Sequence, residues 1–179
     1  MSVLLIILLG LAVIILVILI AAAFLKDEYF IERDIIINRS KQQVFDYLKY
    51  LKNASQYNKW MMTDPDLRSE YTGTDGTIGF ISAWDSDNKQ VGKGEQQITD
   101  IKAGERIDYE IRLEKPFKGT SFAYITTEAI SNMQTKVQWV FKGSRNFAMK
   151  IFHLLFNLKK VLGKDLDRSL QNLKTILEK

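Results

Sequence analysis

The residues able to do chemistry are few and widely spaced. The chain has one histidine, His153, and no cysteine, so disulfides and thiolate metal sites are excluded, and a zinc site or His-based nucleophile pair has little support. We expect His153 to be a structural or surface residue. Asp64/Asp66 and Asp85/Asp87 have the residue type for acid–base work or Ca²⁺ binding, but both pairs fall at expected turns, where Asp usually bonds its own backbone. The sequence therefore gives no catalytic residue, no metal site and no cofactor.

The net charge of +4 is carried by the last segment of the chain. From Phe147 onward there are seven Lys or Arg residues and three acidic ones, so the rest of the chain is balanced. Two interpretations are open, a solvated helix face or a surface for an anionic partner such as lipid headgroups. Nucleic-acid binding is poorly supported, because the aromatic residues of this segment lie on its apolar side and not between its charges. Gly92 and Gly94 lack the third glycine and the following helix of a dinucleotide-binding motif.

The N-terminal stretch Ser2–Leu25 has 24 residues without a charge. About 20 apolar residues suffice to cross a membrane, so we expect an uncleaved single-pass anchor in residues 1–26 and a separate domain in residues 27–179. A cleavable signal peptide is the alternative, since Ala21-Ala22-Ala23 looks like a cleavage site, but a basic n-region is missing and the apolar core is longer than is typical of signals. Basic residues follow the stretch and none precedes it, which favours a cytoplasmic domain.

Apolar residues recur every three or four positions from Asn146 to Glu178. This spacing predicts one long amphipathic helix. At a rise of ~1.5 Å per residue it would be roughly 50 Å long, so it needs a broad surface on which to bury its apolar face.

The preceding sequence supplies such a surface. Tyr29–Asn38 is rich in β-branched and aromatic residues and predicts a first strand. Ser40 with Gln43 predicts a capping box at the start of a short helix, and Asn53 opens a second short helix that runs through Trp60. Turn residues then separate six further predicted strands, whose short links favour antiparallel hairpins. These strands are Leu67–Gly73, Ile78–Ser86, Val91–Ile101, Arg106–Glu114, Thr120–Ile130 and Thr135–Lys142. We expect an α+β domain in which a curved sheet wraps around the last helix.

Two predicted strands have inward faces that fill little space. One carries Ser121, Ala123 and Thr127, and the other carries Gly94 and Gln96. Because protein interiors are normally packed to crystal density, small and polar residues on an inward face indicate a cavity. In the alternative interpretation, Trp60, Trp84 or Phe152 fills the space and the glycines bend the strand.

The order of elements and several short motifs resemble the START-related superfamily, and within it the polyketide cyclase/dehydrase and lipid-transport branch. The motifs are Val44-Phe45-Asp46-Tyr47-Leu48 with Trp60, Val91-Gly92-Lys93-Gly94, Lys115-Pro116-Phe117-Lys118-Gly119, Gly163-Lys164-Asp165-Leu166, and Leu170 with Asn172-Leu173-Lys174. The resemblance covers about Tyr29 to Lys179. It implies a helix-grip fold, a seven-stranded antiparallel sheet that grips the final helix around an apolar ligand pocket. It implies no single activity, and no catalytic set is carried over.

Three functions follow as hypotheses. The first is a membrane-anchored binding module for a hydrophobic or lipid-like molecule, its pocket lined by Trp60, Trp84, Gln96, Tyr109, Ile111, Ala123, Trp139, Phe152 and Phe156. The second is an enzyme of cyclase or dehydratase type, in which Tyr109, Gln96 or Thr127 orients an enolisable substrate. The third is an interaction module that docks an unidentified protein through an exposed Phe122/Tyr124 face.

Overall fold

The computed structural model describes residues 2–116 and 118–179, with the side chains of all of these except His153 and Leu158. The expectation for His153 therefore lies outside the described residues. In chain order the elements are α1 Val3–Phe24, β1 Glu28–Ile37, α2 Lys41–Lys49, the 3-10 turn η1 Leu51–Asn53, α3 Ala54–Tyr57, β2 Arg68–Thr72, β3 Ile81–Asp85, β4 Lys93–Lys102, β5 Arg106–Lys115, β6 Gly119–Ser131, β7 Gln134–Ser144, α4 Phe147–Phe156 and α5 Leu158–Leu177.

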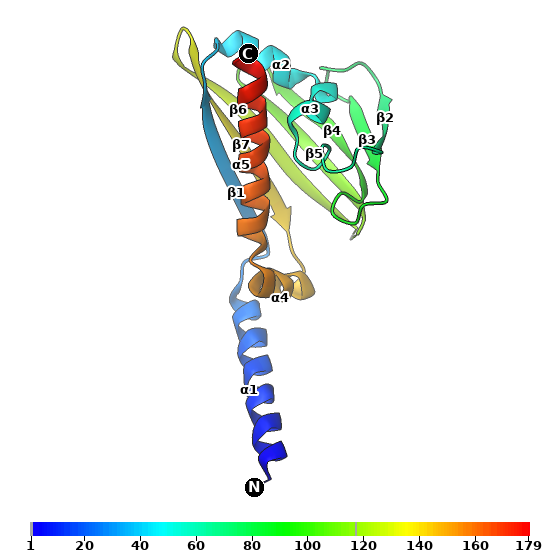
Figure 1. Cartoon of the computed structure of the whole chain (residues 1–179), viewed down its shortest axis with the longest axis vertical. Helices are drawn as coiled ribbons and strands as arrows, with labels where there is room; N and C mark the ends of the chain where they lie inside the picture. Colours follow the sequence, from blue (N-terminus) through cyan, green and yellow to red (C-terminus); the bar gives the residue numbers. More distant parts are fainter. Residues whose placement is uncertain (1, 117) are drawn as a thin grey trace.

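The seven strands form one antiparallel sheet in the order β1-β7-β6-β5-β4-β3-β2, which confirms the prediction. The register fixes which strand ends lie together. Glu28 pairs with Ser144 and Lys93 pairs with Lys115, so the start of β1 and the end of β5 share one end of the sheet. We call this the α1 end, because α1 joins the domain there, and the opposite end, beside α2, the α2 end (Figure 1).

The sheet curves around α5, which runs from the α1 end to the α2 end (Figure 1). Polar contacts hold α5 against β1, among them a hydrogen bond from Lys174 Nζ to the Ile36 carbonyl oxygen at 2.7 Å. Arg33 Nε donates to Asp167 at 3.0 Å, and the backbone amide of Asn38 donates to the Glu178 carboxylate at 2.6 Å. The sheet therefore grips the helix along its length, as the helix-grip expectation requires.

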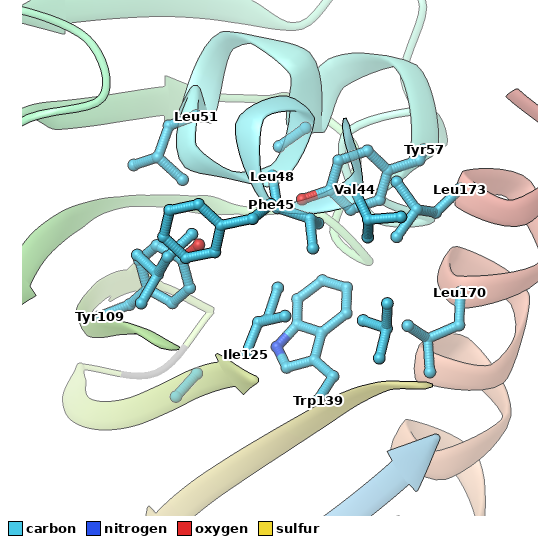
Figure 2. Close-up of a cluster of buried hydrophobic side chains, with 14 of the residues drawn as sticks. Val44, Phe45, Leu48, Leu51, Tyr57, Tyr109, Ile125, Trp139, Leu170 and Leu173 are labelled. Carbon is cyan, nitrogen blue, oxygen red and sulfur yellow. The ribbon is translucent and has the colours of Figure 1, made fainter. Parts of the chain in front are cut away.

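The short helices cover the α2 end. The predicted capping box is present, with Ser40 and Gln43 each accepting a hydrogen bond from the other's backbone amide. The second short helix ends at Tyr57 and does not run through Trp60 as predicted, because the Asn58 side chain accepts the Trp60 amide and turns the chain. The side chains of α2 meet the sheet and α5 in a closely packed cluster (Figure 2). Its buried members include Val44, Phe45, Leu48, Tyr57, Tyr109, Ile125, Trp139, Leu170 and Leu173.

The prediction of one continuous helix from Asn146 to Glu178 is wrong at one residue. Asn157 takes the left-handed conformation, with φ 45°, which ends α4, and its side chain accepts the Lys160 amide at the start of α5. Asparagine adopts this conformation at lower cost than most residues. The apolar spacing continues across the break, so periodicity does not reveal it. As a result α4 lies across the direction of α5 (Figure 1).

The predicted inward faces are confirmed. On β6, Ser121, Ala123 and Thr127 are buried, whereas Phe122 is exposed. On β5 the inward residues are not equally covered, since Ile107 is 0% exposed, while Ile111 and Leu113 toward the α1 end are only half-buried. This gradient locates the incompletely filled part of the interior.

Helix α1 extends away from the domain as a 22-residue apolar helix (Figure 1). At about 1.5 Å per residue its length matches the ~30 Å hydrocarbon core of a bilayer. Among the described residues it is the one helix that is long and apolar enough to cross a membrane, a test that a signal sequence also passes.

Candidate functional site

A cavity of about 220 Å³ lies between the sheet and α5 in the α1-end half of the domain. Strands β3, β4, β5 and β7 and the loops after β3 and β5 form one wall, and α5 with η1, α3 and the segment after α3 forms the other. The lining is mainly apolar. It consists of Leu51, Ala54, Asn58, Trp60, Met61, Ser82, Trp84, Gln90, Val91, Gln96, Ile111, Leu113, Lys115, Pro116, Trp139, Phe141, Leu162 and Leu166.

Five of the nine residues predicted to line a pocket do line this cavity. They are Trp60, Trp84, Gln96, Ile111 and Trp139. They come from five different segments of the chain, which the antiparallel register and the turn after α3 bring together.

The other four predicted residues lie elsewhere. Tyr109 and Ala123 are buried in the packed cluster and are not among the lining residues, and Phe45 of α2 lies beside Tyr109 (Figure 2). Phe152 and Phe156 lie on α4, are 36% and 57% exposed, and contact each other at 4.4 Å between ring centroids. The break at Asn157 is the physical reason, because it turns α4 away from the sheet.

Ser82 is the most informative lining residue that the sequence analysis missed. It is 4% exposed and pairs directly with Gln96 on β4, so both side chains stand on the inward face. Neither side chain forms a hydrogen bond with a described residue, whereas the nearby Asn58 side chain accepts the Trp60 amide. The alternation of Ser82 with Trp84 in a predicted strand was the available signal.

The small residue at Gly94 does not contribute empty space. A Cβ atom at this position would lie 2.6 Å from the Arg112 carbonyl oxygen and 2.8 Å from the Trp84 ring. Trp84 therefore occupies the volume that the glycine leaves, as the alternative interpretation expected at this one position. The cavity lies beside Trp84, at Ser82 and Gln96.

The cavity has few charged groups in its lining. Among the described lining residues, Lys115 is the only ionisable one. Behind the wall, burial raises the pKa of Tyr109 well above its usual value, and its hydroxyl has no hydrogen-bond partner among the described residues. Trp139 Nε1 is likewise buried without a partner in the described part of the chain. Thr127 does not line the cavity either, and its hydroxyl donates a hydrogen bond to the Gly104 carbonyl at 2.9 Å.

The carboxylate pairs have local partners. Asp64 accepts the Ser86 hydroxyl and the Asp66 amide, and these hydrogen bonds, the Ser86 one first, lower the pKa of Asp64. Arg68 lies between the other two carboxylates, 3.6 Å from Asp85 and 3.3 Å from Asp87.

The outer face of β6 offers little continuous apolar surface. The Arg106 guanidinium lies 3.7 Å from the centre of the Tyr124 ring, which leaves Phe122 as a single exposed aromatic residue there. Scattered exposed apolar residues of this kind are normal on protein surfaces.

Comparison with solved structures defines the class of the domain. A truncated norcoclaurine synthase from Thalictrum flavum matches with a TM-score of 0.64 at 8% identity, over 84% of this chain and 93% of that chain. The Aha1 dimer from Colwellia psychrerythraea matches with 0.59 at 14% identity, over 84% and 96%. A protein from Mesorhizobium loti matches with 0.60 at 11% identity, over 83% and 96%. These likenesses show the fold alone, which is the helix-grip fold.

The amino-acid sequence assigns the chain to a particular family with this fold. Residues 31–178 match the family described as polyketide cyclase / dehydrase and lipid transport. The chain therefore belongs to this family. A comparison with curated proteins gives no match.

Proposed function

We propose that this protein is a membrane-anchored binding module for a hydrophobic or lipid-like molecule that carries a polar group. The observation that carries the proposal is the cavity, a mainly apolar chamber whose few polar lining residues include the directly paired Ser82 and Gln96. Such a combination binds an apolar body by excluding water and orients it by one or two hydrogen bonds. Family membership supports a ligand-binding role.

The size of the cavity restricts the ligand. A cavity of about 150 Å³ accommodates benzene, and sites for drug-sized ligands occupy roughly 300–1,000 Å³. A volume of about 220 Å³ suits a short acyl chain, a small ring system or the tail of a larger lipid whose headgroup stays outside. Among its lining residues Gln90, Lys115 and Pro116 are exposed, and we place the entrance of the cavity beside them.

The position of α1 supports the membrane part of the proposal. We assign residues 1–26 to a single-pass anchor and residues 27–179 to the START-like domain. Because α1 leads directly into the start of β1, the anchor holds the half of the domain that contains the cavity next to the bilayer. The basic residues that follow α1 favour the cytoplasmic side for the domain.

The lining favours binding over acid–base catalysis. General acid–base catalysis needs a titratable group within hydrogen-bond reach of the substrate. Two of the three polar groups expected to orient an enolisable substrate, Tyr109 and Thr127, do not line the cavity, and Gln96 does not titrate. Lys115, the one ionisable residue of the described lining, is exposed to solvent.

The proposal is tested by identifying what the full-length chain carries when it is purified in detergent and analysed by native mass spectrometry. We expect an apolar adduct that Ser82→Phe abolishes, because the new ring fills the cavity. Ala83→Phe is the matched control, since it adds the same ring one residue away on the outer face of β3. Wild-type protein that is consistently free of ligand, or equal occupancy in both variants, would contradict the proposal.

A further inference from the structure

Helix α4 exposes most of its apolar side chains. The exposed set is Phe147, Phe152, Leu154, Leu155 and Phe156, and Val161 in the first turns of α5 continues it. Leu155 and Phe156 are 58% and 57% exposed. Several large exposed apolar side chains on one short helix of a folded domain indicate a contact with a partner or a membrane.

Helix α4 is fastened to the end of α1. Lys150, 9% exposed, forms an ion pair with Asp27 at 2.6 Å. Arg145, just before α4, donates from Nε to the Lys26 carbonyl at 2.8 Å, and its amide donates to the Asp27 carbonyl at 2.8 Å. Ala22, in the last turns of α1, is completely buried at this junction. These contacts fix α4 at the level where α1 ends.

That level is the boundary of the apolar segment. The uncharged run ends at Leu25, and Lys26, Asp27 and Glu28 follow directly. When α1 spans a bilayer, this change from apolar to charged residues lies at the hydrocarbon–headgroup boundary. Because α4 lies across the direction of α1, it then runs along the plane of the membrane (Figure 1). Amphipathic helices that lie in this plane bury their apolar side at the acyl boundary.

The charges beside α4 fit the same surface. Lys159, Lys160 and Lys164 lie in the first two turns of α5, are exposed, and form no ion pair with a described residue. Cations at a helix N-terminus are disfavoured by the helix dipole, so these positions are not explained by the stability of α5. Anionic lipid headgroups attract lysines placed next to a membrane-spanning helix.

We propose that α4 and the first two turns of α5 form an interfacial segment, which lies in the surface of the bilayer that α1 spans and binds anionic headgroups through Lys159, Lys160 and Lys164. The inference rests on the membrane anchoring proposed above. It adds a route for the ligand, because Leu162, which lines the cavity, follows Val161 directly in the chain, so this wall of the cavity borders the proposed lipid surface. The ligand then exchanges between bilayer and cavity without crossing bulk water.

The chain has no cysteine, so single cysteines can carry a fluorescent label without background. The full-length chain is reconstituted in phosphatidylcholine–phosphatidylserine vesicles with the label at Leu155→Cys, Val13→Cys or Phe122→Cys. These sites lie on α4, in the middle of α1 and on the outer face of the sheet. Nitroxide lipids with the quencher near the headgroup or deep in the acyl chain, and iodide in the water, report the depth of each label.

We expect headgroup-proximal lipid to quench Leu155, deep lipid to quench Val13, and iodide alone to quench Phe122. If iodide quenches Leu155 as it quenches Phe122 while Val13 remains in lipid, anchoring stands and the interfacial segment is refuted. If neither quencher reaches Leu155, a second copy or another protein covers α4, and the inference also fails. If lipid does not quench Val13, the anchor itself is wrong and both proposals fall.

A triple variant, Lys159→Gln, Lys160→Gln and Lys164→Gln, tests the headgroup contact. Its matched control neutralises Lys41, Lys102 and Lys179, which lie at the α2 end. We expect phosphatidylserine to increase the quenching at Leu155 in the unaltered and control chains, and this dependence to be lost in the triple variant. An equal response in all three chains would overturn the role of the lysines.

Discussion

The two halves of the interior differ although the same strands build both. On β5, Ile107 and Tyr109 are 0% and 1% exposed, whereas Ile111 and Leu113 on the same face are half-buried. At the α2 end, Phe45 and neighbouring side chains of α2 pack against this part of β5 (Figure 2). At the α1 end less of the chain covers the sheet. The break at Asn157 turns α4 away, so only α5, which begins at Leu158, lies over the strands there. The difference shows that alternation decides which face points inward, and the elements opposite decide whether that face is filled.

The division also separates two tasks. The packed half supplies most of the buried apolar surface, which is the main source of stability in a folded domain. The open half holds the cavity, the polar pair of Ser82 and Gln96, and the junction with α1. Substitutions in the first half should therefore change the free energy of unfolding, and substitutions in the second should change binding.

The largest expected difference between the halves is in the free energy of unfolding when one leucine side chain of α5 is truncated to alanine. Leu170→Ala removes a side chain that is 1% exposed in the packed half and should lower the free energy of unfolding by about 2–5 kcal/mol. Leu162→Ala, at the cavity, should cost under about 1 kcal/mol because the side chain has fewer contacts to lose. Urea unfolding of the full-length chain in nanodiscs, followed by tryptophan fluorescence, measures both. Equal costs would show that the two halves are packed alike.

A smaller effect of opposite sign is expected at Tyr109. Its hydroxyl is buried without a partner among the described residues, and an unsatisfied buried polar group destabilises the native state. Tyr109→Phe should raise the free energy of unfolding by about 1 kcal/mol and leave ligand occupancy unchanged. Tyr124→Phe, on the outer face, is the control and should change stability by less than about 0.5 kcal/mol. Loss of the bound ligand in Tyr109→Phe would mean that the cavity extends into the packed half.

The smallest effect concerns the attachment of α4 and depends on pH. The hydrogen bond and charge of Lys150 lower the pKa of Asp27 below its usual value. A lowered pKa means that the ion pair supports the junction above the ordinary carboxyl pKa of about 3.9 and is lost as the pH falls through the value in the folded protein. We expect a spin label at Phe152→Cys, in detergent micelles, to keep its mobility from neutral pH down to the ordinary carboxyl pKa of about 3.9 and to become more mobile only at lower pH.

Two further chains separate this junction from other carboxylates. Asp27→Asn should be mobile at all pH values, whereas Glu178→Gln, at the far end of α5, should behave as the unaltered chain does. Glu178 is a suitable control because the Asn38 amide, more than any charge, lowers its pKa. A transition that persists in Asp27→Asn would assign the pH dependence to another group.

Much of the fold was predictable because it follows local rules. The capping box at Ser40 and Gln43 and the alternation of β6 depend on residues close in sequence, and the structure confirms both. Five of the nine predicted pocket residues line the cavity because the correct face of each strand could be deduced. Tyr109 and Ala123 were also placed on the correct face, but the sequence did not indicate that the packed cluster buries them. Phe152 and Phe156 were placed on a helix that was assumed to be continuous.

By itself, the sequence determined the order of the elements, the inward faces of the strands and the apolar segment at the N-terminus, because hydrophobic periodicity and turn residues encode them directly. Only the tertiary structure decided which inward positions meet a partner, where the chain bends at Asn157, and that Lys150 reaches Asp27. These features depend on contacts between residues far apart in the chain. A cavity in particular forms where no side chain from the facing element fills the space, and the periodicity of a single strand does not indicate this.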